Sequence, residues 1–225
     1  MIQLVLFDID GTLIRTGGAG VKAFERVFDL VFGVPRATRG MQFAGRTDRS
    51  LVREFLENQG IHPTPEHFEK FLAHYVFLLD QMLQSHRGEI CQGVPEFLRA
   101  LLQTDDPPTF GLLTGNIRIG AEIKLRHHQL WEWFKLGAFG DDHENRNELA
   151  SIAARRGSDL LKKPLAGNEI LVIGDTRLDV ECGKAIGART VAVATGGYTR
   201  EELLKHSPDV AVNHLLELDL KTILA

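Results

Sequence analysis

The sequence predicts an α/β fold, in which a doubly wound parallel β-sheet carries an inserted block of helices. Short, continuous apolar runs end abruptly in polar residues, and such runs are typical of strands buried on both faces of a parallel sheet. Helical patterns lie between the runs, and this alternation indicates helices packed against the sheet. A long early segment without a convincing strand predicts the helical insert.

Five apolar runs predict the strands of the sheet. They cover residues 3–7, 110–113, 170–173, 190–194 and 210–212. A helix is expected over residues 94–102, where apolar residues keep helical spacing behind Pro95, a residue tolerated in a first helical turn. Another helix is expected over residues 178–186, because Gly187 is placed to end it.

Residues 16–87 show three amphipathic helix patterns. The apolar positions that share a helix face are Val21, Phe24, Phe28 and Val31; Leu51, Val52, Phe55 and Leu56; and Phe68, Leu72, Tyr75, Leu79, Met82 and Leu83. We therefore divide the chain into a core domain, residues 1–15 and 88–225, and an inserted helical domain, residues 16–87. Three glycines within residues 17–20 predict a hinge at the junction, since glycine tolerates large dihedral changes.

Composition and charge limit the classes of protein to which the chain can belong. The chain has 225 residues, of which 44% are hydrophobic and 25% charged, so it can bury a full core without disulfides or a structural metal. The net charge of −4 argues against nucleic acid and anionic membranes as partners, because both favour a basic face. Cys91 and Cys182 are far apart, which suits a reducing compartment. Since no signal peptide or membrane span is recognisable, we expect a cytoplasmic protein.

Polar residues follow the ends of the first three predicted strands. They are Asp8, Asp10, Thr114, Asp175 and Asp179. Ligands of an open parallel sheet bind outside the carboxyl ends of its strands, so we expect these side chains in one crevice. Clustered carboxylates raise one another's pKa values unless a cation lies between them. Magnesium favours oxygen ligands together with phosphate and water, and the residues therefore predict a magnesium–phosphate site.

Three segments, in this order, resemble signatures of the haloacid dehalogenase (HAD) superfamily of phosphohydrolases. Residues 8–13 (DIDGTL), after an apolar strand, resemble the first signature. Residues 113–116 (LTGN) resemble the second signature, and residues 172–180 (VIGDTRLDV) resemble the acidic fourth. The resemblance spans nearly the whole chain and implies a Rossmann-like core.

The resemblance implies a phosphatase mechanism in which Asp8 attacks phosphorus and forms an aspartyl-phosphate intermediate. Asp10 would protonate the leaving oxygen and later deprotonate the attacking water. Thr114, with the neighbouring residues Gly115 and Asn116, would hold the phosphoryl oxygens. The magnesium ligands would be Asp8, the backbone carbonyl of Asp10, Asp175 and, as a ligand or a support, Asp179. Family dehalogenases lack an acid at the position of Asp10, so dehalogenation is not expected.

The third signature of the superfamily is normally a lysine, often followed by proline, between the second and fourth signatures. Arg146 stands where a helix is expected to begin and is our candidate for this role, because arginine is always charged and can bind oxygens in bidentate fashion. Lys162 and Lys163, followed by Pro164, are the rivals. They are closer to the lysine–proline pattern, but the residues after them predict an exposed turn.

The inserted helices resemble the cap of the family branch that contains phosphoglycolate phosphatase and β-phosphoglucomutase. Such a cap closes over the site, excludes water and contacts the substrate beyond its phosphate. Arg46 is our candidate for contacting an anionic or polar substrate tail. The alternative is a solvated arginine next to a helix cap at Thr47 or Asp48. The resemblance implies a small phosphorylated metabolite as substrate and a monomer or homodimer.

Three other functions fit parts of the pattern. A phosphoryl-shifting mutase like β-phosphoglucomutase would share the core and need a cap that lets a bisphosphate reorient. A receiver domain also has acidic residues around a phosphorylated aspartate, but that aspartate ends its third strand, and such domains are shorter. A catalytically silent homologue is disfavoured by the intact set of Asp8, Asp10, Thr114 and Asp175. The sequence therefore predicts a magnesium-dependent phosphomonoester hydrolase.

Overall fold

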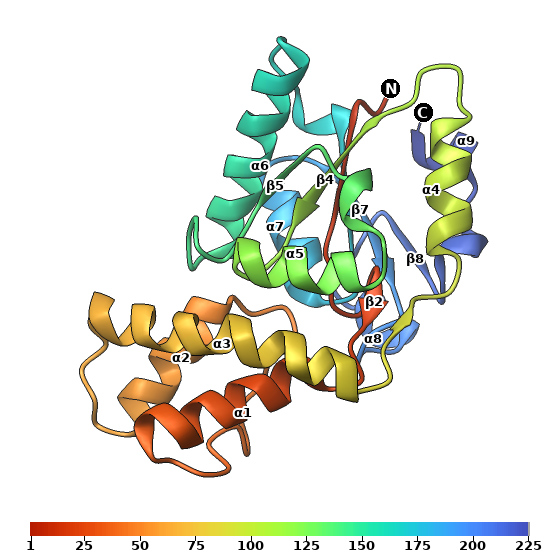
Figure 1. The fold of residues 1–225 in the computed structure, drawn as a ribbon. Coiled ribbons are helices and arrows are strands. Elements are labelled where there is room, and N and C mark those ends of the chain that lie inside the picture. Colours follow the sequence, from red (N-terminus) through yellow and green to blue (C-terminus); the bar gives the residue numbers. More distant parts are fainter. Residues whose placement is uncertain (225) are drawn as a thin grey trace.

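A computed structural model of the protein describes residues 1–224 and contains a six-stranded parallel β-sheet (Figure 1). The strands are β1 (Leu4–Phe7), β4 (Thr109–Leu113), β5 (Leu136–Ala138), β6 (Ile170–Gly174), β7 (Arg189–Val193) and β8 (Val210–Val212). Their order across the sheet is β5-β4-β1-β6-β7-β8. The chain adds β4 and β5 on one side of β1 and the remaining strands on the other, so the order reverses at β1. The predicted doubly wound α/β fold is confirmed.

Five of these strands lie within one residue of their predicted ends, whereas β5 was missed. β5 has only three residues and includes Gly137, which offers no side chain to an apolar pattern. It forms because its backbone pairs with β4, where Leu112 lies opposite Gly137. Such a long-range pairing leaves no local signal in the sequence.

Helices cover both faces of the sheet (Figure 1), which explains why all four residues of β1 are apolar and buried. The helices that follow the insert are α4 (Val94–Leu102), α5 (Arg118–His127), α6 (Arg146–Leu161), α7 (Arg177–Ala185), α8 (Arg200–Leu204) and α9 (Leu220–Leu224), with 3₁₀ turns at Trp131–Trp133, Gly167–Glu169 and Leu215–Glu217. Along β1, Leu4 and Leu6 pack with α6 and α7, whereas Val5 and Phe7 pack with α4 and α9 on the opposite face. Within residues 1–224, no helix has the length and apolar character needed to cross a membrane.

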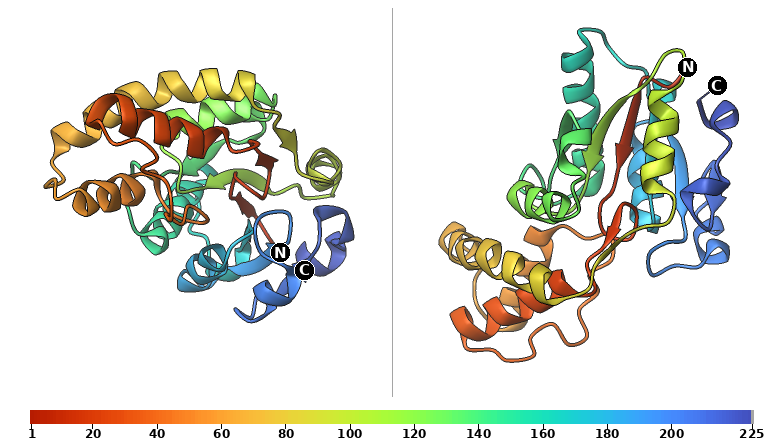
Figure 2. Two further views of the ribbon diagram at one scale, coloured as in Figure 1. Left: turned by 90° about the horizontal axis from the view of Figure 1, so that it is seen from below. Right: turned by 45° about the vertical axis from the view of Figure 1, so that its right-hand side comes forward.

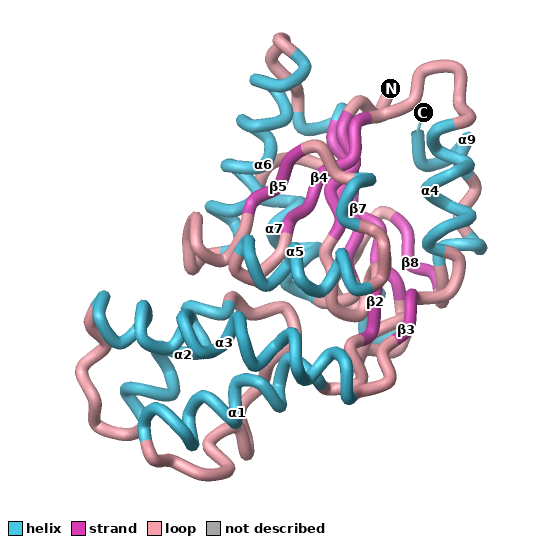
Figure 3. Tube along the Cα trace, in the orientation of Figure 1, coloured by secondary structure: helices cyan, strands magenta, loops and turns pink. Residues whose placement is uncertain are grey.

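Three helices lie apart from the sheet, and we call them and their connections, residues 16–87, the helical insert (Figures 1 and 3). They are α1 (Ala19–Phe32), α2 (Asp48–Asn58) and α3 (Pro65–Ser85). Their predicted apolar faces meet in a separate aromatic core. The ring of Phe28 stacks on Phe55 with centroids 3.6 Å apart, and Phe24 contacts the ring of Tyr75 at 4.8 Å. The insert is therefore stabilised largely by its own side chains.

The two segments that join the insert to the sheet lie side by side (Figure 2). β2 (Ile14–Arg15) leads into the insert and pairs antiparallel with β3 (Glu89–Ile90), which leads out of it. Each has two residues, too few to give a strand pattern. Gly17 and Gly18 follow β2 with φ values of 62° and 88°, which glycine adopts without strain. The hinge predicted there stays a prediction.

Candidate active site

Three loops meet at the edge of the sheet where the strand order reverses. Asp8 follows β1, Thr114 follows β4 on one side of it, and Asp175 follows β6 on the other. The Thr12 hydroxyl donates a hydrogen bond to Asp175 at 3.2 Å across a separation of 163 residues. Ligands of open α/β sheets bind at such reversals, so this edge is the candidate active site.

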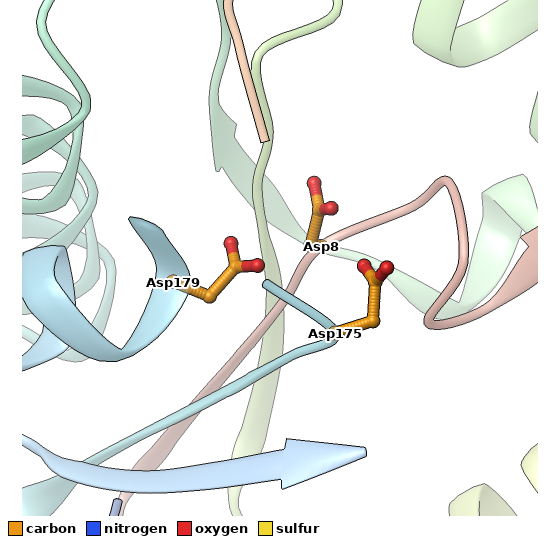
Figure 4. A group of neighbouring side chains, drawn as sticks. All are labelled: Asp8, Asp175 and Asp179. Atoms are coloured by element: carbon orange, nitrogen blue, oxygen red, sulfur yellow. The ribbon is translucent and has the colours of Figure 1, made fainter. Parts of the chain in front are cut away.

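Asp8, Asp175 and Asp179 form an acidic cluster at this edge (Figure 4). One carboxylate oxygen of each lies within 4.8 Å of the other two, and all three side chains are buried. Asp179 lies in the first turn of α7, where it accepts a hydrogen bond from the backbone N–H of Thr176 at 3.0 Å. The segment that resembles the fourth signature thus contributes two carboxylates from one strand end and the helix that follows it.

A buried guanidinium faces the acidic cluster. Arg146 is the first residue of α6, its Nη2 lies 3.6 Å from Oδ1 of Asp8, and it forms an ion pair with Asp179. Lys162 and Lys163, the rivals for the third-signature role, are exposed at the far end of α6. The structure therefore brings Arg146 to the site and leaves both lysines outside it.

Arg146 alone does not neutralise the acidic cluster. Burial, followed by the charge of Asp179, raises the pKa of Asp8 to about 7, although Arg146 lowers it. Burial, followed by the charges of Asp179 and Asp8, raises the pKa of Asp175 well above its usual range. A cation bound among the carboxylates would restore their ionised forms. Three converging carboxylate oxygens suit a hard divalent cation, so the residues fit a metal site of this kind.

The carboxylate of Asp10 belongs to a second, separate group of polar residues. Its Oδ2 accepts hydrogen bonds from Nδ2 of Asn116 and from Nζ of Lys124, both at 2.7 Å. Lys124 also donates to Oδ1 of Asn116 at 2.6 Å, and Nδ2 of Asn116 donates to Oγ1 of Thr114 at 2.9 Å. We call Asp10, Thr114, Asn116 and Lys124 the Asp10 network. Two aspartates that are two residues apart therefore have different partners.

Lys124 is the site residue that the sequence analysis missed. It lies in α5, and only 5% of its side chain is exposed. It follows Ala121 by three residues and precedes Leu125 by one, and both of these are buried. This spacing places Lys124 on the apolar face of the helix. Because a lysine is rarely buried without a partner, its place on that face is the signal that could have identified it.

Two glycines allow the loops of the site to approach one another. Gly11 has a φ of 88°, and a Cβ atom there would overlap the carboxylate of Asp175. A Cβ atom at Gly115 would overlap the backbone carbonyl of Arg46 in the helical insert. Larger residues at these positions would therefore displace Asp175 or separate the insert from the core.

Comparison with known proteins decides the family. The model of the protein family described as haloacid dehalogenase-like hydrolase matches residues 5–193 of the chain. The chain belongs to this family. The predicted superfamily is thereby confirmed, and the fold and the strand-end site belong to a HAD hydrolase.

Two distant relatives and one solved structure are similar to this HAD hydrolase over nearly their whole length. Pyrophosphatase PpaX of Bacillus pumilus (strain SAFR-032) is 26% identical over 227 residues, which cover 96% of this chain and 94% of that protein. Phosphoglycolate phosphatase of Vibrio vulnificus (strain YJ016) is 25% identical, with the same coverage of both. Among solved structures, a hydrolase from Pseudomonas syringae has a TM-score of 0.75 at 20% identity and covers 100% of both chains.

The helical insert of this HAD hydrolase contacts the core at the start of α2. Thr47 caps α2, and its hydroxyl donates to the carbonyl oxygen of Glu144 at 3.1 Å. The backbone N–H of Asp48 donates to the carbonyl oxygen of Gly115 at 2.8 Å. Arg53 donates two hydrogen bonds to the carboxylate of Glu144, at 2.8 and 2.9 Å. These contacts hold the insert against the loops at the strand ends.

A cavity of about 410 Å³ lies where the insert and the strand ends of the HAD hydrolase meet. The predicted site residues that line it are Asp8, Asp10, Arg46, Thr114, Gly115, Asn116, Arg146 and Asp175. Asp179 contacts Arg146 and Thr176. The guanidinium of Arg46 pairs with Glu54 and donates to the carbonyl oxygen of Ser50 at 3.2 Å. The volume suits a small ligand.

Proposed function

We propose that this HAD hydrolase is a magnesium-dependent phosphomonoester hydrolase that acts on a small phosphorylated metabolite. The observation that carries the proposal is the different environment of the two aspartates after β1. Asp8 lies in the acidic cluster beside Arg146, whereas Asp10 binds Lys124 and Asn116. Carboxylates in different environments can take different roles, here those of nucleophile and proton-transfer group.

In the first proposed step, a carboxylate oxygen of Asp8 attacks phosphorus, and the bond between phosphorus and the ester oxygen breaks. Asp10 donates a proton to that oxygen, so the alcohol leaves uncharged. Oγ1 of Thr114 accepts hydrogen bonds from the backbone and side-chain N–H groups of Asn116, at 3.3 and 2.9 Å. The hydroxyl proton of Thr114 is donated to no other group within residues 1–224, and we propose that it is donated to a phosphoryl oxygen. The Gly115 and Asn116 backbone is proposed to bind the other phosphoryl oxygens.

In the second proposed step, Asp10 takes a proton from water as the water oxygen attacks the phosphorus of the aspartyl phosphate. The bond between phosphorus and Asp8 breaks, which releases phosphate and regenerates the carboxylate. Mg²⁺ would offset the phosphoryl charge, held by Asp8, Asp175, the backbone carbonyl of Asp10 and, as a ligand or support, Asp179. Arg146 holds Asp8 in place and offsets its charge.

We propose that the helical insert, residues 16–87, is a cap domain over a core domain of residues 1–15 and 88–225. Arg46 is proposed to face the polar tail of the substrate, because it lines the cavity from the insert side. The relatives named pyrophosphatase and phosphoglycolate phosphatase support transfer of a phosphoryl group to water. The net charge of −4 supports a protein that binds neither nucleic acid nor anionic membranes. We also propose that it is a cytoplasmic monomer or homodimer.

Removal of divalent metal is expected to lower phosphate release on the order of 100-fold or more, because the carboxylates and the phosphoryl group would then repel one another. The measurement is phosphate release from p-nitrophenyl phosphate by protein treated with EDTA, followed by titration with MgCl₂. Titration with CaCl₂ is the control, since the larger ion prefers more ligands and should restore less activity. Equal rates in EDTA and in MgCl₂ would contradict the proposed function.

Lys124→Met is expected to lower kcat/KM by about 10- to 100-fold for an alkyl phosphate, because Asp10 loses the cation that holds it in place. The loss should be smaller for p-nitrophenyl phosphate. Nitrophenolate leaves without a proton, so a misplaced general acid matters less. The measurement is kcat/KM for ethyl phosphate and for p-nitrophenyl phosphate, with the melting temperature of each variant.

The matched control is Lys205→Met, which removes an exposed lysine of the core. Lys124→Arg retains the charge and should recover part of the activity towards ethyl phosphate. If Lys124→Met lowers kcat/KM for both esters by the same factor, Lys124 stabilises the fold or binds the phosphate group, and it does not position Asp10.

A further inference from the structure

Tyr75 presents an unpaired hydroxyl to the cavity. Only 1% of Tyr75 is exposed, and its ring is packed between Phe24 and Phe71 in the core of the insert. Tyr75 nevertheless lines the cavity, and its hydroxyl has no hydrogen-bond partner among residues 1–224. Burial, followed by the charges of Asp48 and Asp10, raises the pKa of Tyr75, so the hydroxyl stays protonated close to two carboxylates.

Asp48 also lines the cavity, is only 6% exposed, and is near enough for its charge to raise the pKa of Tyr75. Its Oδ2 accepts a hydrogen bond from the backbone N–H of Ile117 at 2.9 Å. No donor within residues 1–224 reaches its Oδ1. Burial raises the pKa of Asp48 to about 7, although the charge of Lys124 lowers it. The wall of the cavity therefore contains one acceptor, Oδ1 of Asp48, and one hydroxyl, that of Tyr75, to which no group within residues 1–224 is hydrogen-bonded.

The basic side chains that line the cavity are already paired. Arg15 pairs with Glu89, Arg46 with Glu54, Lys124 with Asp10, and Arg146 with Asp8 and Asp179. Among residues 1–224, the cavity therefore has no unpaired cation that could bind a second anionic group. The side chains of Val21, Phe24, Phe43 and Leu51 make much of the remaining wall apolar.

We propose that the substrate is a phosphomonoester whose leaving group ends in a hydrogen-bond donor, a hydroxyl or an ammonium, and carries no second anionic group. The donor would bind Oδ1 of Asp48, and a hydroxyl would also accept a hydrogen bond from Tyr75. A carboxylate or a second phosphate in the same place would lie next to the carboxyl group of Asp48, and the nearby cation, Lys124, is already bound to Asp10. This inference rests on the proposed function and names the chemical class of its substrate.

A set of esters that differ mainly in their terminal group tests the inference. The two-carbon members are 2-hydroxyethyl phosphate, phosphoethanolamine, ethyl phosphate and 2-phosphoglycolate, and the three-carbon pair is glycerol 3-phosphate and 3-phosphoglycerate. With saturating MgCl₂, kcat/KM is expected to be about tenfold or more higher for a hydroxyl or an ammonium than for the carboxylate of equal length. The comparison of the first two esters shows which donor is preferred.

The variant that isolates the unpaired hydroxyl is Tyr75→Phe. It is expected to lower kcat/KM for the preferred hydroxyl ester by about two- to tenfold relative to ethyl phosphate, as expected for one lost hydrogen bond. Its melting temperature should not fall, because the hydroxyl has no partner in the protein. Tyr198→Phe is the matched control, since it removes the other tyrosine hydroxyl of the chain, outside the cavity.

Three outcomes would overturn the inference. The first is a kcat/KM for 2-phosphoglycolate and 3-phosphoglycerate that equals or exceeds the values of their hydroxyl counterparts. The second is an equal effect of Tyr75→Phe on the hydroxyl ester and on ethyl phosphate. Both leave the proposed phosphatase function standing. The third is an absence of phosphate release from every ester and from p-nitrophenyl phosphate, which would overturn the proposed function as well.

Discussion

Replacement of Asp8 by asparagine is expected to lower phosphate release by roughly 10⁴-fold or more, because an amide oxygen is a poor nucleophile at the position where the carboxylate attacks phosphorus. The fold should survive the change. Asp8 contributes one of three buried carboxylates within 4.8 Å, and its neutral replacement removes repulsion from the acidic cluster. We expect the melting temperature to stay equal or to rise. The measurements are phosphate release with MgCl₂ and thermal unfolding of both proteins.

Two observations complete the test of Asp8. Asp105→Asn makes the same chemical change at an exposed position and should retain full activity. Wild-type protein quenched in acid during turnover should carry one phosphoryl group on the peptide that contains Asp8, and the asparagine variant should carry none. Activity of the variant within tenfold of wild type would show that another group attacks phosphorus.

Arg146→Met is expected to damage both stability and catalysis. Asp8 and Asp179 would remain buried without their cation, and breaking a buried pair in this way costs about 3–5 kcal/mol. At about 2–4 °C per kcal/mol for a chain of this size, the melting temperature should fall by roughly 6–20 °C. MgCl₂ should recover part of that loss, because the metal binds only the folded acidic cluster. Loss of a buried positive charge beside the transferred group should also lower kcat by about 100- to 1000-fold.

Arg155→Met is the matched control for Arg146, since Arg155 is an exposed arginine on the same helix. Arg146→Lys keeps the charge but not the forked geometry, so it should recover stability better than activity. Unfolding curves with and without MgCl₂, together with steady-state kinetics, distinguish the two effects. A melting temperature of Arg146→Met equal to that of wild type would show that the acidic cluster does not depend on this guanidinium.

Residues at the ends of strands could be predicted from the sequence because their signal is local. An apolar run that stops at a polar residue marks both the strand and its carboxyl end, and parallel pairing then brings Asp8, Thr114 and Asp175 together. The helix that begins at Arg146 could also be predicted from a local pattern, the helical spacing of Leu149 and Ile152. No such run marks β5, whose three residues depend on pairing with β4.

Residues that reach the site from the sides of helices could not be predicted in the same way. Lys124 lies near two other basic residues at the end of α5, Arg126 and His127, where a positive charge is ordinary. Its contact with Asp10 depends on how α5 is rotated against the sheet. Tyr75 was predicted as part of a core-facing helix surface, and only the position of α3 over the strand ends places its hydroxyl at the cavity.

The pairing of β2 with β3 bears on how such enzymes diversify. The chain leaves the core after Arg15 and returns at Glu89, and these two residues lie directly opposite each other in the ladder. Antiparallel neighbours this close can be joined by a turn of two residues, so the whole insert can be exchanged for a hairpin without re-routing any strand of the sheet. Asp8, Asp175, Asp179 and Arg146 all lie outside the exchanged segment. Substrate preference can therefore change during evolution while the residues proposed to break the phosphate ester are retained.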